Sequence, residues 1–245
     1  MSSTRYAENH VVYHYDGSYD GLMCCVFESF LNKELPAAIE REDEAKDTIF
    51  PIKEIETDRE RANRVKRSIP QKISLEAKEL IEECFMTDLN EKELHILCFM
   101  YLGFKYGSKV TSMYENEHVS AMKKSVQLLS REAHHMSGMI HFSDYGGIMM
   151  CRISPRNNIL PLIADHFSDK YSGDTFMIYD KTHRSALIHK DGRTNIIDTR
   201  KIEPPELSPE ESKYRGLWKR FFEMVEIDGE RLDGYGLLPP LRFRN

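Results

Sequence analysis

The segment from Val119 to Phe142 constrains the fold more than any other part of the chain. Its apolar and small residues recur at spacings of three and four, which places them on one stripe of a helix; they are Val119, Met122, Val126, Leu129, Ala133 and Met136. Gly138 follows as an expected left-handed cap, and the pattern after it alternates as in a strand. The sequence therefore predicts one helix from Val119 to Met136 that leads into a sheet.

The opposite stripe of the same helix is polar and mostly basic. Its members lie three or four residues apart and should share one face; they are Lys124, Gln127, Arg131, His134 and His135. Such a face could contact an anionic partner. It has a simpler explanation as well, because cations near the C-terminus of a helix stabilise its exposed carbonyl groups.

The chain beyond Gly138 carries the signals of a sheet. We expect strands at 139–143, 148–153, 175–180, 184–190 and 194–198, joined mainly as antiparallel hairpins. Asp191-Gly192 is typical of a type I′ turn. A helix from Ile159 to Asp169 should lie between the hairpins, and a second helix, from Ser208 to about Val225, should dock through Trp218.

The first half of the chain is predicted to be mainly helical. A strand from Val11 to Tyr15 precedes a turn and a helix from about Tyr19 to Leu31, with Ser18 as its N-cap. The acidic run from Glu40 to Asp47 has no apolar period, so we expect an exposed loop or a frayed helix end. The fold class is therefore α+β: a mainly helical half (1–136) packed with a C-terminal antiparallel sheet and a docking helix (137–245), in a single compact domain (1–245).

The most basic window of the chain runs from Arg61 to Lys72 and contains no acidic residue. Its basic residues are Arg61, Arg64, Lys66, Arg67 and Lys72. A stripe that follows phosphates would have this composition, since each Lys or Arg can displace a condensed counterion. The alternative is a solvated helix face balanced by acidic neighbours. Pro70 is expected to break the segment, and Ser74 to cap the next helix.

The whole chain carries a formal net charge of −6, which excludes a uniformly basic nucleic-acid coat. Any nucleic-acid surface must therefore be local. Residues 1–10 are polar and lack an apolar secretory segment, and the longest apolar region, Ile96 to Phe104, is too short to cross a bilayer. We expect a cytoplasmic protein.

Several short motifs occur together in a fixed order along the chain. The central ones are Arg131-Glu132-Ala133-His134, continuing through Met136 and Gly138 to Phe142, then Asn158-Ile159-Leu160-Pro161-Leu162 and His166-Phe167. The others are Tyr15-Asp16-Gly17-Ser18 with Val26-Phe27-Glu28, Lys72-Ile73-Ser74 with Ala77, Leu217-Trp218 with Phe221, and Leu238-Pro239. With these motifs the chain resembles the bacterial probable DNA metabolism proteins, a family of unknown biochemical function.

The resemblance implies an association with DNA work but no assigned catalytic residue. Such domains are typically encoded beside a radical-SAM protein, and in some chains they are fused to a uracil-DNA glycosylase-like domain. This chain lacks the cysteine spacing of a radical-SAM cluster, so that chemistry would belong to the partner. Positions that are often basic in the family are His135, Ser137 and His141 here, so this chain lacks a fixed charge there at neutral pH.

The candidate acid–base groups are Glu132, His134, Asp165 and His166, because a histidine titrates near neutrality and a buried carboxylate can be shifted toward it. They form a site only if the fold gathers them. The chain has no zinc-ligand spacing, so we expect no metal and no cofactor. The five cysteines are an odd number without a CxxC pair and are expected to be reduced core thiols.

We favour an accessory protein of DNA modification or repair that binds nucleic acid or presents it to a radical-SAM partner. Its nucleic-acid contacts would come from Arg61, Arg64, Lys66, Arg67, Lys72, Lys124, Arg131, His134 and His135. Two alternatives stay open: a DNA-processing enzyme of hydrolase or glycosylase-like type, and a protein-binding scaffold without nucleic-acid contact. A concave site that combines the acid–base candidates would favour the enzyme, and an exposed apolar patch would favour the scaffold.

Overall fold

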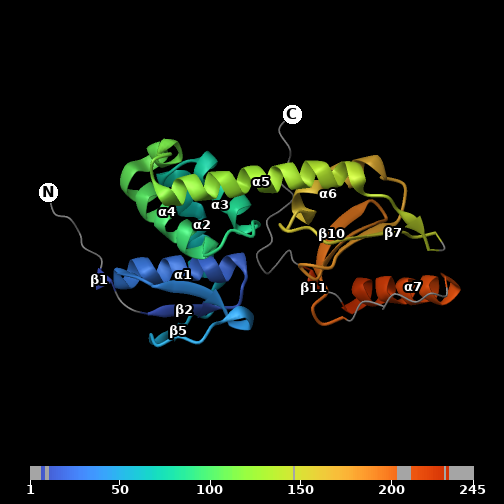
Figure 1. Ribbon diagram of the computed structural model, residues 1–245, viewed down its shortest axis with the longest axis horizontal. Coiled ribbons are helices and arrows are strands. Elements are labelled where there is room, and N and C mark those ends of the chain that lie inside the picture. Colours follow the sequence, from blue (N-terminus) through green and yellow to red (C-terminus); the bar gives the residue numbers. More distant parts are fainter. Residues whose placement is uncertain (1–6, 9–10, 146, 203–210, 229, 232–245) are drawn as a thin grey trace. The chain divides into compact units, whose positions relative to one another are not determined.

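The computed structural model describes residues 7–8, 11–145, 147–202, 211–228 and 230–231. The chain divides into two compact units, Met1–Gln127 and Leu128–Asn245. Each unit has its own sheet, and the boundary falls within helix α5 (Glu117–Met139), whose course can be followed by colour in Figure 1. The predicted boundary between residues 136 and 137 falls within the same helix, and the single domain stays a prediction.

The first unit is built on a short parallel sheet. Strand β2 (Val12–Tyr15) lies between β4 (Ala38–Arg41) and β5 (Ile52–Glu54), and both pair with it in parallel. Helix α1 (Tyr19–Asn32) follows β2 directly and lies along this sheet (Figure 1). The predicted strand and helix are confirmed, and the Ser18 hydroxyl accepts a hydrogen bond from the Gly21 amide at 2.9 Å as the N-cap.

The remaining elements of this unit are mostly helices. They are α2 (Arg59–Lys72), α3 (Leu75–Phe85) and α4 (Lys92–Tyr106), with 3₁₀ segments at Glu42–Glu44 and Gly107–Ser112 and a small parallel pair of β1 (Ala7–Glu8) with β3 (Glu34–Leu35). Ser74 caps α3 as predicted, by accepting from the Ala77 amide at 3.0 Å. The expected break at Pro70 is wrong, because Pro70 lies inside α2.

The expectation of a loop or frayed helix end at 40–47 is wrong at its start, since Glu40 and Arg41 belong to β4. This strand has four residues, and the neighbouring β5 has three. Alternation cannot be recognised over so few residues, and pairing with the central strand determines both elements instead. The first half therefore contains a parallel sheet that the sequence pattern did not predict.

The second unit contains a six-stranded mixed sheet in the order β11-β10-β9-β8-β7-β6. Its elements are β6 (Ser143–Asp144), β7 (Met149–Ile153), α6 (Leu160–Lys170), β8 (Phe176–Asp180), β9 (Ser185–Lys190), β10 (Arg193–Asp198), α7 (Glu211–Asp228) and β11 (Glu230–Arg231). The predicted hairpins β6–β7, β8–β9 and β9–β10 are antiparallel, and Asp191 and Gly192 have the positive φ values of a type I′ turn. The α+β class is confirmed.

Two local predictions in this unit are wrong. Strand β7 pairs with β8 in parallel, because α6 crosses between them and returns the chain to the starting edge. Gly138 is not a left-handed cap, because it has no positive φ and α5 continues to Met139. Of the expected strand at 139–143, only Ser143 is in a strand, paired in β6 together with Asp144.

The sheet of the second unit has a distinct cluster on each face. Helix α7 packs through Trp218, Phe221, Phe222 and Val225 against Met177 and Tyr179 and their neighbours, which confirms the docking helix. On the other face, the Phe142 ring lies 5.8 Å from Phe167 and 5.5 Å from Phe176 between centroids. The two clusters together hold the strands of the sheet in place between α7 and α6.

Some predictions fall outside the described residues. The start of the last helix at Ser208 and the Leu238-Pro239 motif are among them. Within the described part of the chain, no helix is both long enough and apolar enough to span a membrane.

Candidate nucleic-acid interface

Helix α2 separates apolar and basic side chains onto two faces. Ala62, Val65 and Ile69 are buried at spacings of three and four. The predicted residues Arg61, Arg64, Arg67 and Lys72 are all exposed on the remaining surface. None of these four forms an ion pair with another described residue. The basic window is therefore a helical face and not a loop.

Lys66 differs from its neighbours in the window. Its ammonium lies 2.7 Å from the carboxylate of Asp20, which is 8% exposed, at the start of α1. This ion pair joins α2 to α1, so Lys66 acts in the structure of the unit. Of the five basic residues predicted in the window, four remain available to a partner.

Aromatic rings lie under the basic face and position its cations. The guanidinium carbons of Arg61 and Arg64 lie 5.6 Å and 5.9 Å from the centroid of Phe27, and the Lys72 ammonium lies 5.8 Å from that of Phe104. Such contacts favour an extended cation over the ring and restrict its other conformers. A shallow open hollow borders the same face, and Asn63 and Gln71 add uncharged hydrogen-bonding groups to its lining.

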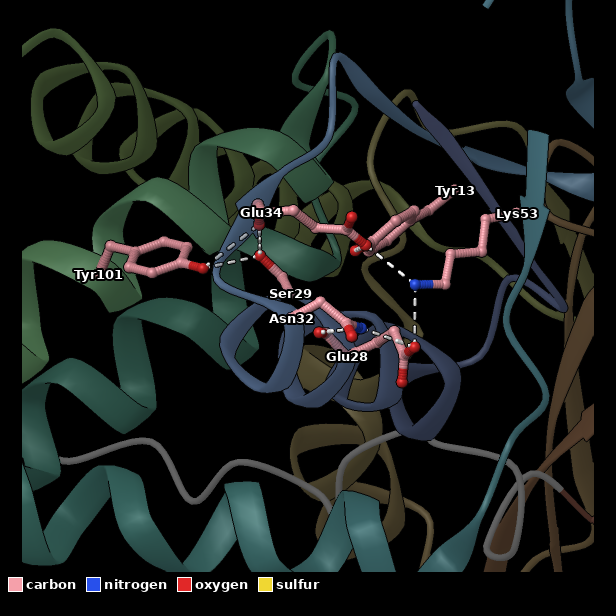
Figure 2. A network of polar contacts seen from close by, with 7 residues as sticks. All are labelled: Tyr13, Glu28, Ser29, Asn32, Glu34, Lys53 and Tyr101. Atoms are coloured by element: carbon pink, nitrogen blue, oxygen red, sulfur yellow. Dashed lines mark hydrogen bonds and ion pairs between the residues drawn. The ribbon is translucent and has the colours of Figure 1, made fainter. Parts of the chain in front are cut away.

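A partly buried polar network fixes α1, which carries Phe27. Figure 2 shows Lys53 of β5 between two carboxylates, and its ammonium is 2.9 Å from both Glu28 and Glu34. The Tyr13 hydroxyl donates to Glu34, while the Asn32 amide donates to Glu28 at 2.8 Å. This network was not predicted from the sequence, because its members come from β2, α1, β3 and β5.

The network predicts an acid-sensitive contribution to stability. The hydrogen bond from Lys53 holds the pKa of the Glu28 carboxyl below its usual value. A carboxyl whose pKa is lower in the folded state stabilises the fold fully above its unfolded pKa, near 4.5, and loses this contribution as pH falls through the folded value.

Glu28→Gln should therefore cost about 1.5 kcal/mol at neutral pH, the lower end of the range for a hydrogen bond to a charged group. The cost should shrink toward zero in acid. Urea unfolding between about pH 7 and 3 measures both. An equal cost at all pH values would contradict the assigned pKa shift.

The polar stripe of α5 is exposed as predicted. Lys124, Gln127, Arg131, His134 and His135 are all open to solvent along the helix. No ion pair joins any of them to another residue that the structure describes. Because α5 continues to Met139, Arg131 lies two turns before its end and the last turn contains no basic residue, so stabilisation of the exposed C-terminal carbonyl groups does not explain the stripe.

Glu132 has a structural role in the second unit. Its carboxylate accepts hydrogen bonds from the Arg156 amide at 2.7 Å, the Asn157 amide at 2.9 Å and the Asn157 side-chain amide at 2.6 Å. It thereby holds the loop after β7 against α5. The N-cap position of α6 is Ile159 and not Asn157, whose side chain makes one of these bonds.

Replacing Glu132 with alanine should lower the free energy of unfolding by about 1–3 kcal/mol, because the buried Asn157 donors would lose their acceptor. Chemical denaturation measures the change. Arg131→Ala, at the exposed neighbouring position, is the matched control and should change stability by no more than about 0.5 kcal/mol. Equal stability of the Glu132 variant and the wild type would contradict this role.

The acid–base candidates do not form a common site in the described structure. Glu132 binds the loop, His134 is exposed on α5, and Asp165 and His166 lie on α6. No hydrogen bond or ion pair between described residues links any two of them. The same part of the chain contains no group of three or more His, Cys, Asp or Glu side chains that could hold a metal ion.

The cysteines are poorly suited to nucleophilic chemistry. All five are free thiols; Cys24, Cys25 and Cys84 are buried, and Cys98 and Cys151 are partly buried. Burial raises the pKa of the Cys84 thiol to about 12 and that of Cys98 to about 11. A thiol with such a pKa is almost entirely protonated at neutral pH, and the thiolate is the reactive form.

Comparison with known proteins identifies a family for the larger part of the chain. No curated protein and no solved structure gives a significant match. The model of a domain of unknown function, DUF4130, matches residues 90–233. The match includes α5 and the sheet of the second unit, and α2 precedes it. Since it spans more than half of the sequence, the chain belongs to the DUF4130 family.

Proposed function

We propose that this protein is a nucleic-acid-binding accessory of DNA modification or repair, and that it binds phosphates through the exposed face of α2. One observation carries the proposal: Arg61, Arg64, Arg67 and Lys72 are exposed on one helical face without an ion-pair partner in the described structure. Their charge is not balanced by a paired acid, as it would be if this were a helix face neutralised by its neighbours. These four are available to an external anion.

The proposed phosphate contacts predict how strongly the affinity for DNA should depend on salt concentration. Each cation that neutralises a phosphate contributes about 0.9 to the slope of log affinity against log salt for duplex DNA, and about 0.7 for a single strand. Four contacts would give slopes of roughly −3.6 and −2.8. Contacts to phosphates carry no sequence information, so we expect little preference among sequences.

The accessory role, in place of an enzymatic one, is supported by the dispersal of the acid–base candidates. Glu132 is already hydrogen-bonded to three donors. The resemblance to the probable DNA metabolism proteins adds a radical-SAM protein as the proposed partner, which would perform the chemistry on the bound nucleic acid. This part is tested by co-expression with a radical-SAM protein encoded beside this one, followed by recovery through a tag on either chain. Separate elution of the two chains would refute the proposed partnership.

Fluorescence anisotropy with labelled single-stranded and duplex DNA tests the binding proposal. The full chain should bind both forms at about 50 mM salt and release them as salt is raised, because counterion release drives the contact. A labelled RNA of the same length distinguishes DNA from RNA preference. Absence of binding to every form at low salt would refute the proposal.

A further inference from the structure

One edge of the sheet in the second unit collects the ends of three strands. β7 and β8 are parallel and end side by side, where the Lys181 amide donates to the Ile153 carbonyl at 3.0 Å. β10 runs in the same direction as β8, because both are antiparallel to β9. Its end is joined to the β8–β9 turn by the hydrogen bond from the Thr199 amide to the Arg184 carbonyl, 2.8 Å long. The residues at these ends form one continuous edge.

This edge carries exposed cations from separate parts of the sequence. Arg152, Lys181 and Arg184 are all exposed, and none forms an ion pair with another described residue. Arg152 is in register with Tyr179, a neighbour of the turn. Burial raises the pKa of the Tyr179 hydroxyl, and the positive charges of Arg184 and Arg152 both oppose this increase.

The acidic residues at this edge are already engaged. Asp180 is fully buried and accepts from the Thr182 amide at 2.9 Å and from the His183 ring nitrogen Nδ1 at 2.7 Å. Asp198 accepts from the Arg200 guanidinium at 2.7 Å. These carboxylates stabilise the turns through local hydrogen bonds and form no ion pair with the three exposed cations. The edge therefore presents a net positive charge to solvent.

We propose that this edge, defined by Arg152, Lys181 and Arg184, binds the phosphate backbone of a nucleic acid as a second contact surface of the protein. The inference rests on the proposed nucleic-acid function and adds a site in the other unit. The cations follow a line: neighbouring strands are about 4.8 Å apart, so the two steps from β7, which carries Arg152, to β9, which Arg184 precedes, cover roughly 10 Å. Successive phosphates rise about 3.4 Å along a strand of duplex DNA, so a line of this length faces several of them.

A polymer fits this arrangement better than a small phosphate ligand. A single phosphate requires donors that converge within hydrogen-bonding distance of one group, whereas these side chains come from β7 and from both ends of the β8–β9 turn. The cations of this edge do not form a basic segment in the sequence, because residue 152 is 29 positions from residue 181 and only folding brings the two strands together.

The test compares two triple variants of the full chain in the same unit. Arg152→Gln/Lys181→Gln/Arg184→Gln removes the edge cations, and Lys170→Gln/Lys219→Gln/Arg220→Gln removes the same charge from exposed positions on α6 and α7. With a labelled single-stranded oligonucleotide at about 50 mM salt, the edge variant should bind at least about tenfold more weakly than the control. Its salt slope should be shallower by about 2, from three contacts at about 0.7 each.

The outcomes separate this inference from the proposed function. Unchanged binding in the edge variant, with binding lost when Arg64 and Arg67 are replaced, would overturn the edge and leave the α2 face intact. Loss only in the edge variant would support the edge and refute the α2 face. Equal weakening in the edge and control variants would show a dependence on net charge alone and overturn the edge, as would wild-type protein that binds no nucleic acid.

A single charge reversal distinguishes loss of binding from loss of folding. Lys181→Glu lies in an exposed turn and should leave the melting temperature unchanged while weakening binding. Polyglutamate of matched charge is the competitor that tests for an acidic protein partner. If polyglutamate displaces the wild type from the oligonucleotide as effectively as unlabelled DNA does, the surface does not distinguish a nucleic acid from an acidic polypeptide, and the inference fails.

Discussion

Replacing both Arg64 and Arg67 with alanine should weaken binding to single-stranded and duplex DNA on the order of 100-fold at low salt. Each arginine is exposed on the α2 face and, as a phosphate contact, contributes about tenfold at about 50 mM salt through the release of one counterion. The loss should be similar for unrelated sequences, because phosphates carry no sequence information. Fluorescence anisotropy with several oligonucleotides measures it.

The matched control removes two charges elsewhere in the same unit. Lys105→Ala/Lys109→Ala changes exposed residues at the end of α4 and in the following 3₁₀ segment. This variant should bind within about threefold of the wild type, since long-range charge effects are screened over about 10 Å at 0.1 M salt. Comparable weakening in the two double variants would argue against a specific α2 surface.

Replacing Trp218 with alanine should destabilise the second unit by about 3–5 kcal/mol, the usual cost of truncating a buried Trp. Trp218 is 3% exposed, and its ring lies 6.0 Å from that of Tyr179 and 5.3 Å from that of Phe221. The substitution would leave a large cavity between α7 and the sheet. Urea or thermal unfolding measures the change in the free energy of unfolding.

The adjacent residue provides the control for this prediction. Leu217 is 41% exposed, so Leu217→Ala should cost less than about 1 kcal/mol. Similar stability of the two variants would show that α7 does not dock through Trp218. The comparison also distinguishes a core role from base stacking, because a ring that is 3% exposed has no free face for a base.

Elements with strong local signals were predictable from the sequence. The stripe from Val119 to Met136 specified α5, since six apolar positions repeat at helical spacing over several turns. Ser18 and Ser74 identified helix starts because their side chains satisfy amide groups only three residues away. Asp191-Gly192 specified a hairpin because both residues tolerate positive φ.

Pairings between distant segments were not predictable in the same way. β4 and β5 are too short to show alternation, and their parallel pairing depends on β2, more than twenty residues earlier. The parallel contact of β7 with β8 likewise depends on where α6 packs, whereas the sequence pattern specifies only that two strands flank a helix.

The candidate site shows the same division. The basic composition of the window from Arg61 to Lys72 was recognised in the sequence, but its helix was not, and the burial of Val65 and its apolar neighbours determines which face carries the exposed arginines. The ion pair of Lys66 with Asp20 could not be predicted, since it joins residues 46 positions apart. The loop contacts of Glu132 could not be predicted either. Both oxygens of its carboxylate accept backbone hydrogen bonds, so this candidate acid has a structural role.

The salt dependence of DNA binding by the wild type and by the Arg64→Ala/Arg67→Ala variant tests the central claim most directly. We predict a linear decrease of log affinity with log salt for the wild type, and a duplex-DNA slope that is shallower by about 1.8 in the variant, from two contacts at about 0.9 each. Equal slopes for the two proteins would contradict the claim that these arginines of the α2 face contact phosphates.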